Sequence, residues 1–384
     1  MPCRAEDYGG PMVNGAVSGD DLRQRLEAAQ RGIEAQGWSA LLVTPGPDLQ
    51  YLTGYDAVPL ERLTCLVLRD GAEPFLVVPE LEIAAAEASP VGALGLDLLP
   101  WAETDDPYAR TANMLGPVAV VAVDDHMWAQ KTLGFQAVLP DVSLRLAGPV
   151  LGSLRMRKSA DEVAALRAAA EAIDSVHEQV PGWLRPGRTE REVAADIERA
   201  ILAAGHVRVD FVIVGSGPNG ASPHHEVSDR VIGVGDPVVV DIGGTMASGY
   251  CSDSTRTYSV GEPAPEFRAY YDVLQRAQWA AVQAVRPGVP CETIDAIARD
   301  IITSEGYGDL FVHRTGHGIG LETHEEPYIV AGNALPLDTG FAFSVEPGIY
   351  RSGLDGARIE DIVVCGSDGP IVLNERPREL QVIR

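Results

Sequence analysis

The hydrophobic pattern of residues 21–150 changes repeatedly between helical and strand spacing. Leu22, Leu26 and Ile33 recur at helical spacing before Gly37, which predicts a helix. A further helix-like segment is predicted over residues 80–88. The short apolar runs that predict strands are 40–43, 65–68, 75–78 and 118–123. Because strands alternate with helices, this part of the chain is predicted to be a small α/β domain.

From Ser159 onward the pattern predicts helices grouped around strands. Glu162 follows Ser159, and Glu192 follows Thr189, at the spacing of a capping box, so helices are predicted to begin at both places. The other predicted helices are 266–285 and 292–305, and the predicted strands are 211–214, 238–242, 256–260 and a Gly-rich, strand-like stretch over 316–382. Helices segregated in this way predict an α+β domain with a mostly antiparallel sheet.

The chain has 384 residues, which is long enough for two domains, because single cores rarely grow beyond about 250–300 residues. Gly-Pro and Gly-Ser pairs over 148–152 predict a boundary there. We therefore expect a disordered N-terminal tail over 1–20, a first domain over 21–150 and a second over 151–384.

Composition narrows the class of protein. A net charge of −25 argues against a nucleic-acid partner, which needs clustered Lys and Arg. The first twenty residues lack the apolar stretch of a signal peptide, and the purest aliphatic run, 118–123, is far shorter than the about 20 residues of a membrane helix. The five cysteines form no C-x-x-C pair, so neither a disulfide framework nor a structural zinc site is indicated. We expect a soluble protein of the reducing cytoplasm with no membrane partner.

One glycine-rich segment matches the pattern of a dinucleotide-binding motif. Residues 215–220 match G-x-G-x-x-G, but that motif needs a helix to open within the run, and Pro218 and Pro223 oppose one. A tight loop that presents His224 or His225 is predicted instead, and a bound nucleotide is not expected.

Two aspartates suggest the first part of a metal site. Asp241 ends a strongly apolar strand, and Asp253 follows twelve residues later. Gly243, Gly244 and Gly249 allow the chain to turn, so a hairpin would bring the two carboxylates face to face. Two unrelated acids, one capping a turn and the other paired with a nearby arginine, remain an alternative.

Further candidate ligands follow in the last part of the chain. His317 has glycines on both sides, which would leave the backbone uncommitted and the imidazole presented, and His313 and His324 lie close in sequence. Glu346 precedes Pro-Gly, and Glu360 lies near Arg358. Strand alternation places Arg358 and Glu360 on one face and Asp361 on the other, where it would pair with another element.

Together these residues offer four carboxylates and one imidazole: Asp241, Asp253, His317, Glu346 and Glu360. An oxygen-rich set of this kind suits Mn²⁺ and tolerates Co²⁺, Zn²⁺ or Fe²⁺. Four negative charges balance two divalent ions, and such a pair can activate water at neutral pH.

The motifs around these residues resemble those of the proline-specific metallopeptidases of the pita-bread fold, namely prolidase (Xaa-Pro dipeptidase) and aminopeptidase P. The matching segments are Asp-Ile-Gly-Gly at 241–244, Asp-Ser-Thr-Arg-Thr at 253–257, Gly-His-Gly-Ile-Gly-Leu-Glu-Thr-His-Glu-Glu-Pro at 316–327, Val-Glu-Pro-Gly-Ile-Tyr at 345–350 and Arg-Ile-Glu-Asp at 358–361. The resemblance covers 155–384, and the preceding segment resembles the family's creatinase-like N-terminal domain. The aspartate pair is one residue further apart than the commonest spacing. Creatinase shares the fold but lacks these ligands.

The resemblance implies a role for each matching residue. Asp241 would chelate one ion, Asp253 would bridge both, and His317, Glu346 and Glu360 would complete the cage around a nucleophilic hydroxide. Glu346 would also carry the proton to the proline nitrogen. Two further histidines would take part in catalysis and substrate binding: His324 would stabilise the tetrahedral intermediate, and His224 would help to bind the substrate and its leaving side. His313 would bind near the proline side, and Arg358 would support the glutamates or a carboxylate. No role is implied for His225, and Cys251 is read as core packing.

The resemblance implies a manganese-dependent, homodimeric Xaa-Pro dipeptidase that acts on a small peptide with proline in the second position. The compact length favours the dipeptidase slightly over aminopeptidase P, which acts on longer Xaa-Pro peptides. The alternative that is not an enzyme is a non-catalytic binding protein with the pita-bread fold. It is disfavoured because all five ligands are present. Methionine aminopeptidase is disfavoured because that family usually lacks the α/β domain.

Overall fold

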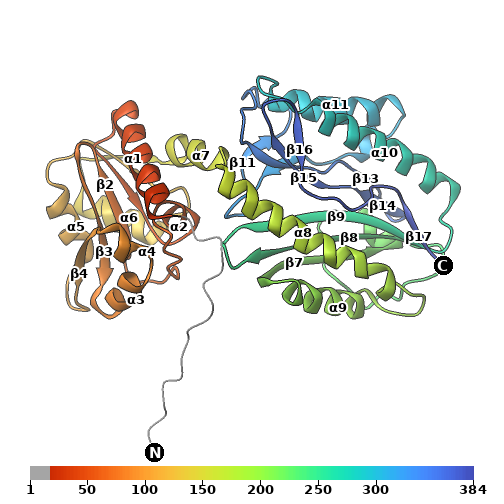
Figure 1. The fold of residues 1–384 in the computed structure, drawn as a ribbon, viewed down its shortest axis with the longest axis horizontal. Helices are drawn as coiled ribbons and strands as arrows, with labels where there is room; N and C mark the ends of the chain where they lie inside the picture. The colour runs from red at the N-terminus through yellow and green to blue at the C-terminus, as the bar shows by residue number, and fades with distance from the viewer. Residues whose placement is uncertain (1–17) are drawn as a thin grey trace, which may run out of the picture.

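The structure, a computed structural model, describes residues 18–384, and its first domain is built on one six-stranded sheet (Figure 1). The strand order is β4-β3-β2-β1-β5-β6, with β1 antiparallel to β2 and parallel to β5. The strands are β1 (Ala40–Val43), β2 (Cys65–Arg69), β3 (Ala72–Pro79), β4 (Asp97–Trp101), β5 (Val120–Val123) and β6 (Ser143–Leu146). Apolar residues on both faces are buried under helices, which confirms the predicted α/β domain.

The helices of this domain include several that the hydrophobic pattern did not predict. They are α1 (Gly19–Gln36), α2 (Pro47–Thr53), η1 (Glu80–Glu82), α3 (Ile83–Ala88), α4 (Pro90–Leu94), α5 (Pro107–Leu115), α6 (Ala129–Val138) and α7 (Gly148–Met156). Ser18 caps α1, so Gly19 and Asp20 are helical and not part of the predicted tail. The rest of that tail, residues 1–17, lies outside the described residues. The predicted boundary at 148–152 falls within α7.

Two pairs of helices enclose the strands of the second domain (Figure 1). The helical elements are α8 (Ala160–Trp183), α9 (Glu190–Ala203), η2 (Gly217–Ala221), α10 (Pro265–Ala284), α11 (Cys291–Ser304) and η3 (Gly308–Leu310). Ser159 and Thr189 both form the predicted capping boxes. Because a capping box depends only on residues three apart, both helix starts could be predicted from sequence.

Three sheets lie between these helices, in the orders β17-β9-β8-β7, β11-β10-β12-β15-β16 and β13-β14. The strands are β7 (His206–Ser216), β8 (Pro237–Met246), β9 (Cys251–Val260), β10 (Gly316–Gly318), β11 (Glu325–Ile329), β12 (Ala342–Val345), β13 (Gly348–Arg351), β14 (Asp355–Arg358), β15 (Asp361–Cys365), β16 (Pro370–Val372) and β17 (Gln381–Ile383). All the pairings are antiparallel except that of β17 with β9. The predicted α+β domain is confirmed.

The β8–β9 hairpin differs from the prediction in its register and its turn. Asp241 pairs with Thr255, and Asp253 pairs with Gly243, so the two aspartates are diagonal neighbours and not face to face. Both still point to the same face, because residues two apart along a strand share a face. Asp241 lies within β8 and not at its end, and the chain turns only after Met246. The ladder of β8 between β7 and β9 therefore extends the strand through the glycines.

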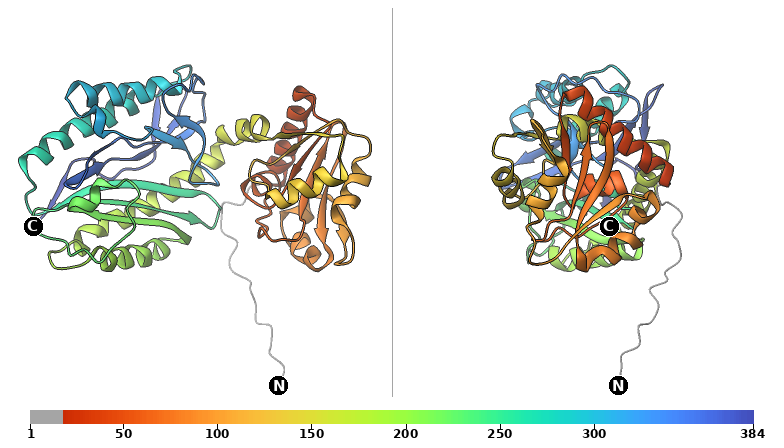
Figure 2. Two further views of the ribbon diagram at one scale, coloured as in Figure 1. Left: turned by 180° about the vertical axis from the view of Figure 1, so that it is seen from behind. Right: turned by 90° about the vertical axis from the view of Figure 1, so that its left-hand side faces the viewer.

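The helix α7 leads from the first domain to the second, as the view from behind shows (Figure 2). Its Arg155 pairs with Asp48 of α2 and also with Glu322 and Glu325 of the second domain. Lys158 forms another buried pair with Glu325. Breaking a buried pair costs about 3–5 kcal/mol, so this cluster fixes the junction between the domains.

Within residues 18–384 no helix combines the length and the apolar composition that crossing a bilayer requires. The described cysteines, Cys65, Cys251, Cys291 and Cys365, are all buried and free. Cys251 packs in a hydrophobic cluster with Tyr250 and Ile319, in agreement with the interpretation as core packing.

Candidate metal centre

A cavity of about 600 Å³ opens between the sheets of the second domain. Every residue singled out from the sequence for the site lines it: His224, Asp241, Asp253, His313, His317, His324, Glu346, Arg358 and Glu360. Its remaining lining residues are Phe211, Ile213, Pro223 and Arg314. Segments more than a hundred residues apart in sequence therefore meet at one place.

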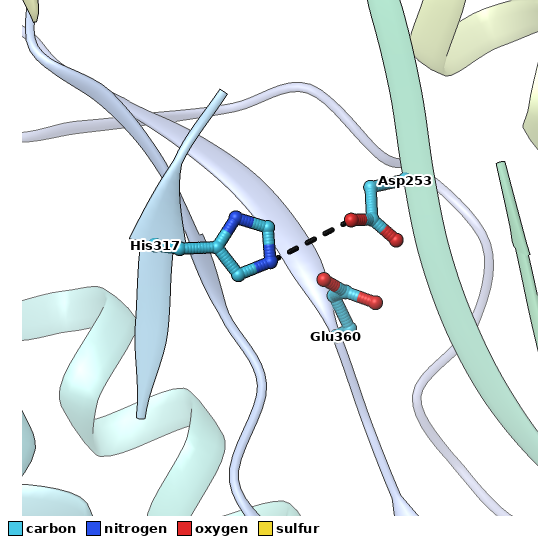
Figure 3. A group of neighbouring side chains, drawn as sticks. All are labelled: Asp253, His317 and Glu360. Atoms are coloured by element: carbon cyan, nitrogen blue, oxygen red, sulfur yellow. Dashed lines mark ion pairs between the residues drawn. The ribbon is translucent and has the colours of Figure 1, made fainter. Parts of the chain in front are cut away.

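Three side chains form the centre of this cavity (Figure 3). Asp253 of β9, His317 of β10 and Glu360, which follows β14, each bring one ligand atom to within 4.8 Å of the others. His317 Nε2 lies 3.6 Å from Asp253 Oδ2 and 3.1 Å from Glu346 Oε1. All three central residues are buried, which is costly for charged groups unless a cation or another partner compensates them.

The orientation of His317 leaves one ring nitrogen for a metal. Its Nδ1 lies 3.1 Å from the carbonyl oxygen of Gly318, and because a carbonyl can only accept, Nδ1 carries the proton. The other nitrogen, Nε2, faces Asp253 and Glu346, and it hydrogen-bonds to Glu346 while no metal is bound. A metal ion on Nε2 would replace that hydrogen bond, with Nδ1 still held by Gly318.

The glycines beside His317 serve close packing and not the backbone freedom that we predicted. His317 lies in β10, and a Cβ on Gly316 would lie 1.8 Å from the carbonyl oxygen of Ser344. A Cβ on Gly318 would lie 2.1 Å from the carbonyl oxygen of Glu326. The two neighbouring chains can approach β10 only because both positions lack a side chain.

Two carboxylate oxygens of the cavity are buried and lack a hydrogen-bond partner among the described residues, Asp241 Oδ1 and Glu360 Oε1. The second oxygen of each group is held: Arg358 donates to Asp241 Oδ2, and Thr255 donates to Glu360 Oε2 at 2.9 Å. An unpaired buried carboxylate oxygen is rare because it loses its hydration. Oxygen ligands for divalent ions would account for both, so the residues present fit a metal site.

Crowding of the carboxylates shifts their pKa values. Burial, followed by the charges of Glu360, Asp241 and Glu346, raises the pKa of Asp253 well above its usual range. Burial and the charges of Glu346 and Asp241 likewise raise the pKa of Glu360. These groups hold protons when nothing else neutralises them, and a divalent cation would displace those protons.

Glu346 behaves differently from its neighbours. Burial favours its neutral form, but the hydrogen bond and charge of His317, with the charges of His313 and Arg358, lower its pKa to about 2. Its Oε1 also accepts a hydrogen bond from Ser344 Oγ at 3.0 Å. Glu346 is therefore the ionised member of the cage.

The accessory histidines occupy different environments. The ring of His324 lies beside that of His317, tilted by 41° with 4.0 Å between the centroids. Burial, together with the charge of His317, lowers the pKa of His324 to about 4. His313 is engaged on both sides, since Nδ1 lies 2.7 Å from the Arg314 carbonyl oxygen and Nε2 lies 2.9 Å from Tyr350 Oη. His224 is exposed on the rim of the cavity.

The glycine-rich loop that carries His224 is anchored to Glu190 and shows no nucleotide-binding geometry. It forms the short η2, whose Gly220 packs so closely on Gly356 that a Cβ on Gly356 would lie 2.1 Å from the Gly220 carbonyl oxygen. The buried Glu190 accepts hydrogen bonds from Ser216, Asn219 and Ser228 and lies 2.8 Å from His225 Nε2. His225 thus has a structural partner, in keeping with the absence of a predicted role.

Sequence reasoning missed Tyr350, Thr255 and Arg314. Tyr350 Oη accepts a hydrogen bond from Arg358 at 2.8 Å and, in turn, can donate to His313, so it links these two cavity residues. Both Tyr350 and Thr255 lie inside motifs noted above, which was the available signal. Arg314 adjoins His313 in sequence but carried no pattern of its own.

Comparison with known proteins agrees with this geometry. Residues 164–367, more than half of the chain, match the sequence model of "Metallopeptidase family M24". The chain belongs to this family. Residues 25–157 of this M24 chain match "Creatinase/Prolidase N-terminal domain". The family and the fold inferred from the motifs are therefore confirmed, and the protein is a metallopeptidase.

Relatives of this M24 peptidase share nearly its whole length. "Probable dipeptidase PepE" of Mycobacterium tuberculosis is 53% identical over 362 residues, which cover 94% of this chain and 96% of the relative. "Xaa-Pro dipeptidase" of Lactobacillus delbrueckii subsp. lactis is 36% identical over 369 residues, covering 93% and 98%. The crystal structure of dipeptidase PepE from Mycobacterium ulcerans superposes with a TM-score of 0.92 at 53% identity, covering 96% of this chain and 100% of that one. Membership of a metallopeptidase family implies divalent metal ions as cofactors.

Proposed function

We propose that this M24 peptidase is an Xaa-Pro dipeptidase that cleaves the bond before a proline in the second position, with two divalent ions, Mn²⁺ being preferred. The observation that carries the proposal is the cavity in which four carboxylates and His317 converge and two carboxylate oxygens lack partners. The names of the relatives that match over nearly the full chain support the substrate class.

The residues that would hold the ions are Asp241, Asp253, His317, Glu346 and Glu360. When bound, two divalent ions supply an activated water and polarise the scissile carbonyl. Arg358 would hold Asp241 in orientation through its donated hydrogen bond. The four negative charges balance those of two divalent ions, which relieves the repulsion that raises the pKa values of Asp253 and Glu360.

Glu346 is the proposed proton carrier. Its Oε1 is held by Ser344 and His317, whereas Oε2 lies 4.0 Å from Arg358 Nε and accepts no hydrogen bond from the described residues. We assign the transfer to Oε2, which would take a proton from the attacking water and deliver it to the proline nitrogen. That nitrogen has no hydrogen of its own and must gain a proton to leave, so general acid assistance is required.

The remaining lining residues suit the substrate. Phe211, Ile213 and Pro223 give the cavity an apolar wall, against which a proline ring can pack. His324, neutral at pH 7 because its pKa lies near 4, can donate a hydrogen bond to the oxyanion that forms during attack. His224 on the rim is proposed to contact the leaving side of the substrate. The homodimer and the cytoplasmic location stay predictions.

The test compares Ala-Pro with Ala-Pro-Ala. The full chain is treated with a chelator, dialysed and reloaded separately with Mn²⁺, Co²⁺ or Zn²⁺. We expect no turnover after chelation, the highest turnover of Ala-Pro with Mn²⁺, and little turnover of the tripeptide. Turnover of the tripeptide alone would reject the dipeptidase assignment in favour of an aminopeptidase P. Full activity without metal would reject the metal mechanism itself.

A further inference from the structure

Arg314 is a cavity residue whose positive charge is not neutralised. It lines the same cavity as the metal cage and is half-buried. Within residues 18–384 its guanidinium makes no ion pair and no hydrogen bond to another side chain; its contact is a cation–π stack on Tyr328, with 4.3 Å from Cζ to the ring centroid. Half-buried arginines usually pair with a carboxylate, so these free donors suggest a ligand that brings one.

Arg358, the second arginine of the cavity, has no free donor with which to bind a carboxylate of a ligand. Arg358 is fully buried, and its Nε, Nη1 and Nη2 all donate to the protein. Its acceptors are Thr255 Oγ1, Tyr350 Oη and Asp241 Oδ2. Since no lysine lines the described cavity, Arg314 is the one guanidinium or ammonium group there with donors to offer.

Resting on the proposed function, we propose that Arg314 binds the C-terminal carboxylate of the dipeptide and so makes the enzyme select peptides that end at proline. An Xaa-Pro dipeptide carries an ammonium group at one end and a carboxylate at the other. The guanidinium fork of Arg314 matches the carboxylate with two parallel hydrogen bonds. In a longer peptide the carboxylate lies further along the chain, and Arg314 would face an uncharged amide instead.

Tyr328 acts as the platform for this arginine. It lies in β11 and also lines a second cavity, of about 290 Å³, between the domains. His324 lines both cavities, so Arg314 and Tyr328 stand where the two spaces meet. Stacking on the Tyr328 ring restricts the long side chain of Arg314. Less side-chain conformational entropy is then lost when Arg314 binds a substrate. Tyr328 is therefore a positioning residue.

The experiment measures kcat/KM of several enzyme variants on a matched pair of substrates, Ala-Pro and its C-terminal amide, Ala-Pro-NH₂. A charge-assisted hydrogen bond contributes about 1.5–3 kcal/mol, so wild-type kcat/KM should be about 10- to 100-fold higher for the acid than for the amide. Arg314→Gln should lose that same factor on Ala-Pro, chiefly through KM, and change little on the amide. Arg314→Lys should keep part of the preference. Tyr328→Phe should behave as wild type, and Tyr328→Leu should lower the preference for the acid.

Arg191→Gln is the control, because Arg191 pairs with Asp229 on the surface and does not line the cavity. It should leave kcat/KM for both substrates unchanged. Equal losses on acid and amide in Arg314→Gln would overturn the carboxylate-binding role, as would a wild-type enzyme that does not distinguish the two substrates. If the reloaded wild type cleaved neither, the proposed function would fail instead, so the two failures are distinguishable.

Discussion

Arg358 donates a hydrogen bond from Nη2 to Asp241 Oδ2, while Oδ1 of the same carboxylate is buried with no partner among the described residues. One oxygen is thus fixed by the protein and the other is directed into the cavity. Hydrogen bonds to metal-binding carboxylates orient them and are worth about 10- to 100-fold in metal affinity. Arg358 acts through Asp241 in this account.

We therefore expect Arg358→Lys to weaken Mn²⁺ binding by about 10- to 100-fold, because an ammonium group cannot reproduce the guanidinium fork. Titration calorimetry on the chelated full chain measures this directly. Arg351→Lys is the matched control, since Arg351 pairs with Asp355 on the neighbouring strands and lies outside the cavity lining. Unchanged Mn²⁺ affinity in a normally folded Arg358→Lys protein would contradict the role assigned to Arg358.

The raised pKa values of Asp253 and Glu360 predict a pH-dependent stability. In the metal-free protein both groups keep their protons at pH values where the unfolded chain, with carboxyl pKa values near about 4, has lost them. The folded state then binds more protons, so their contribution to stability is present at low pH and is lost as pH rises through the folded pKa values. Bound cations remove this effect. The Mn²⁺-induced increase in melting temperature should therefore grow from about pH 5 to about pH 8.

Replacing one of the crowded carboxylates tests the same electrostatics. At neutral pH, Glu360→Gln should raise the melting temperature of the chelated protein, by about 2–4 °C for each kcal/mol of relieved repulsion, and abolish the stabilisation by Mn²⁺. Melting curves of both proteins with and without Mn²⁺ give the comparison. A chelated variant less stable than the chelated wild type would show that crowding does not destabilise the empty cage.

The close packing of Gly316 beside His317 predicts that a larger residue at this position destabilises the protein. An alanine at Gly316 would place its Cβ against the Ser344 carbonyl oxygen, and overpacking of this kind costs about 1–3 kcal/mol or more. Gly316→Ala should lower the melting temperature and also displace His317. Gly182→Ala in α8 is the control, because no atom lies within 4 Å of its added Cβ and the helix should gain up to about 1 kcal/mol. Equal melting temperatures for the two variants would contradict the steric explanation.

Local sequence determined some elements and not others. The helix starts at Ser159 and Thr189 were predictable because the cap and its partner are three residues apart. In contrast, α5 and α6 escaped prediction. Each buries two residues, one of them polar: Thr111 and Leu115 in α5, and Lys131 and Phe135 in α6. So few buried apolar positions do not mark a helix in the sequence. The strand β8 was predicted too short, because Gly243 and Gly244 taken alone indicate a turn. In the fold they continue the strand, since β8 pairs there with β7 on one side and with β9 on the other.

In the site, too, the residue types could be predicted from local sequence, whereas their arrangement depends on contacts distant in sequence. Chemistry alone pointed to the carboxylates and His317, and the five matching segments indicated the family. The structure places every candidate residue in one cavity. The diagonal placement of Asp241 and Asp253 could not be predicted, because sheet register depends on residues distant in sequence. Arg314 was missed for a related reason: whether an arginine has a partner is decided by the folded surroundings and leaves no trace in sequence.

The proposed reaction requires two metal ions, and Asp253 is one of the residues proposed to hold them. The most direct measurement is the metal content and Ala-Pro turnover of Asp253→Asn beside wild type, both chelated, reloaded with Mn²⁺ and freed of excess metal. Wild type should retain two ions per chain, and the variant should retain fewer and lose at least about 1,000-fold in kcat, since the cage would lose one of its charged ligands. A folded Asp253→Asn protein with two bound ions and full activity would contradict the account.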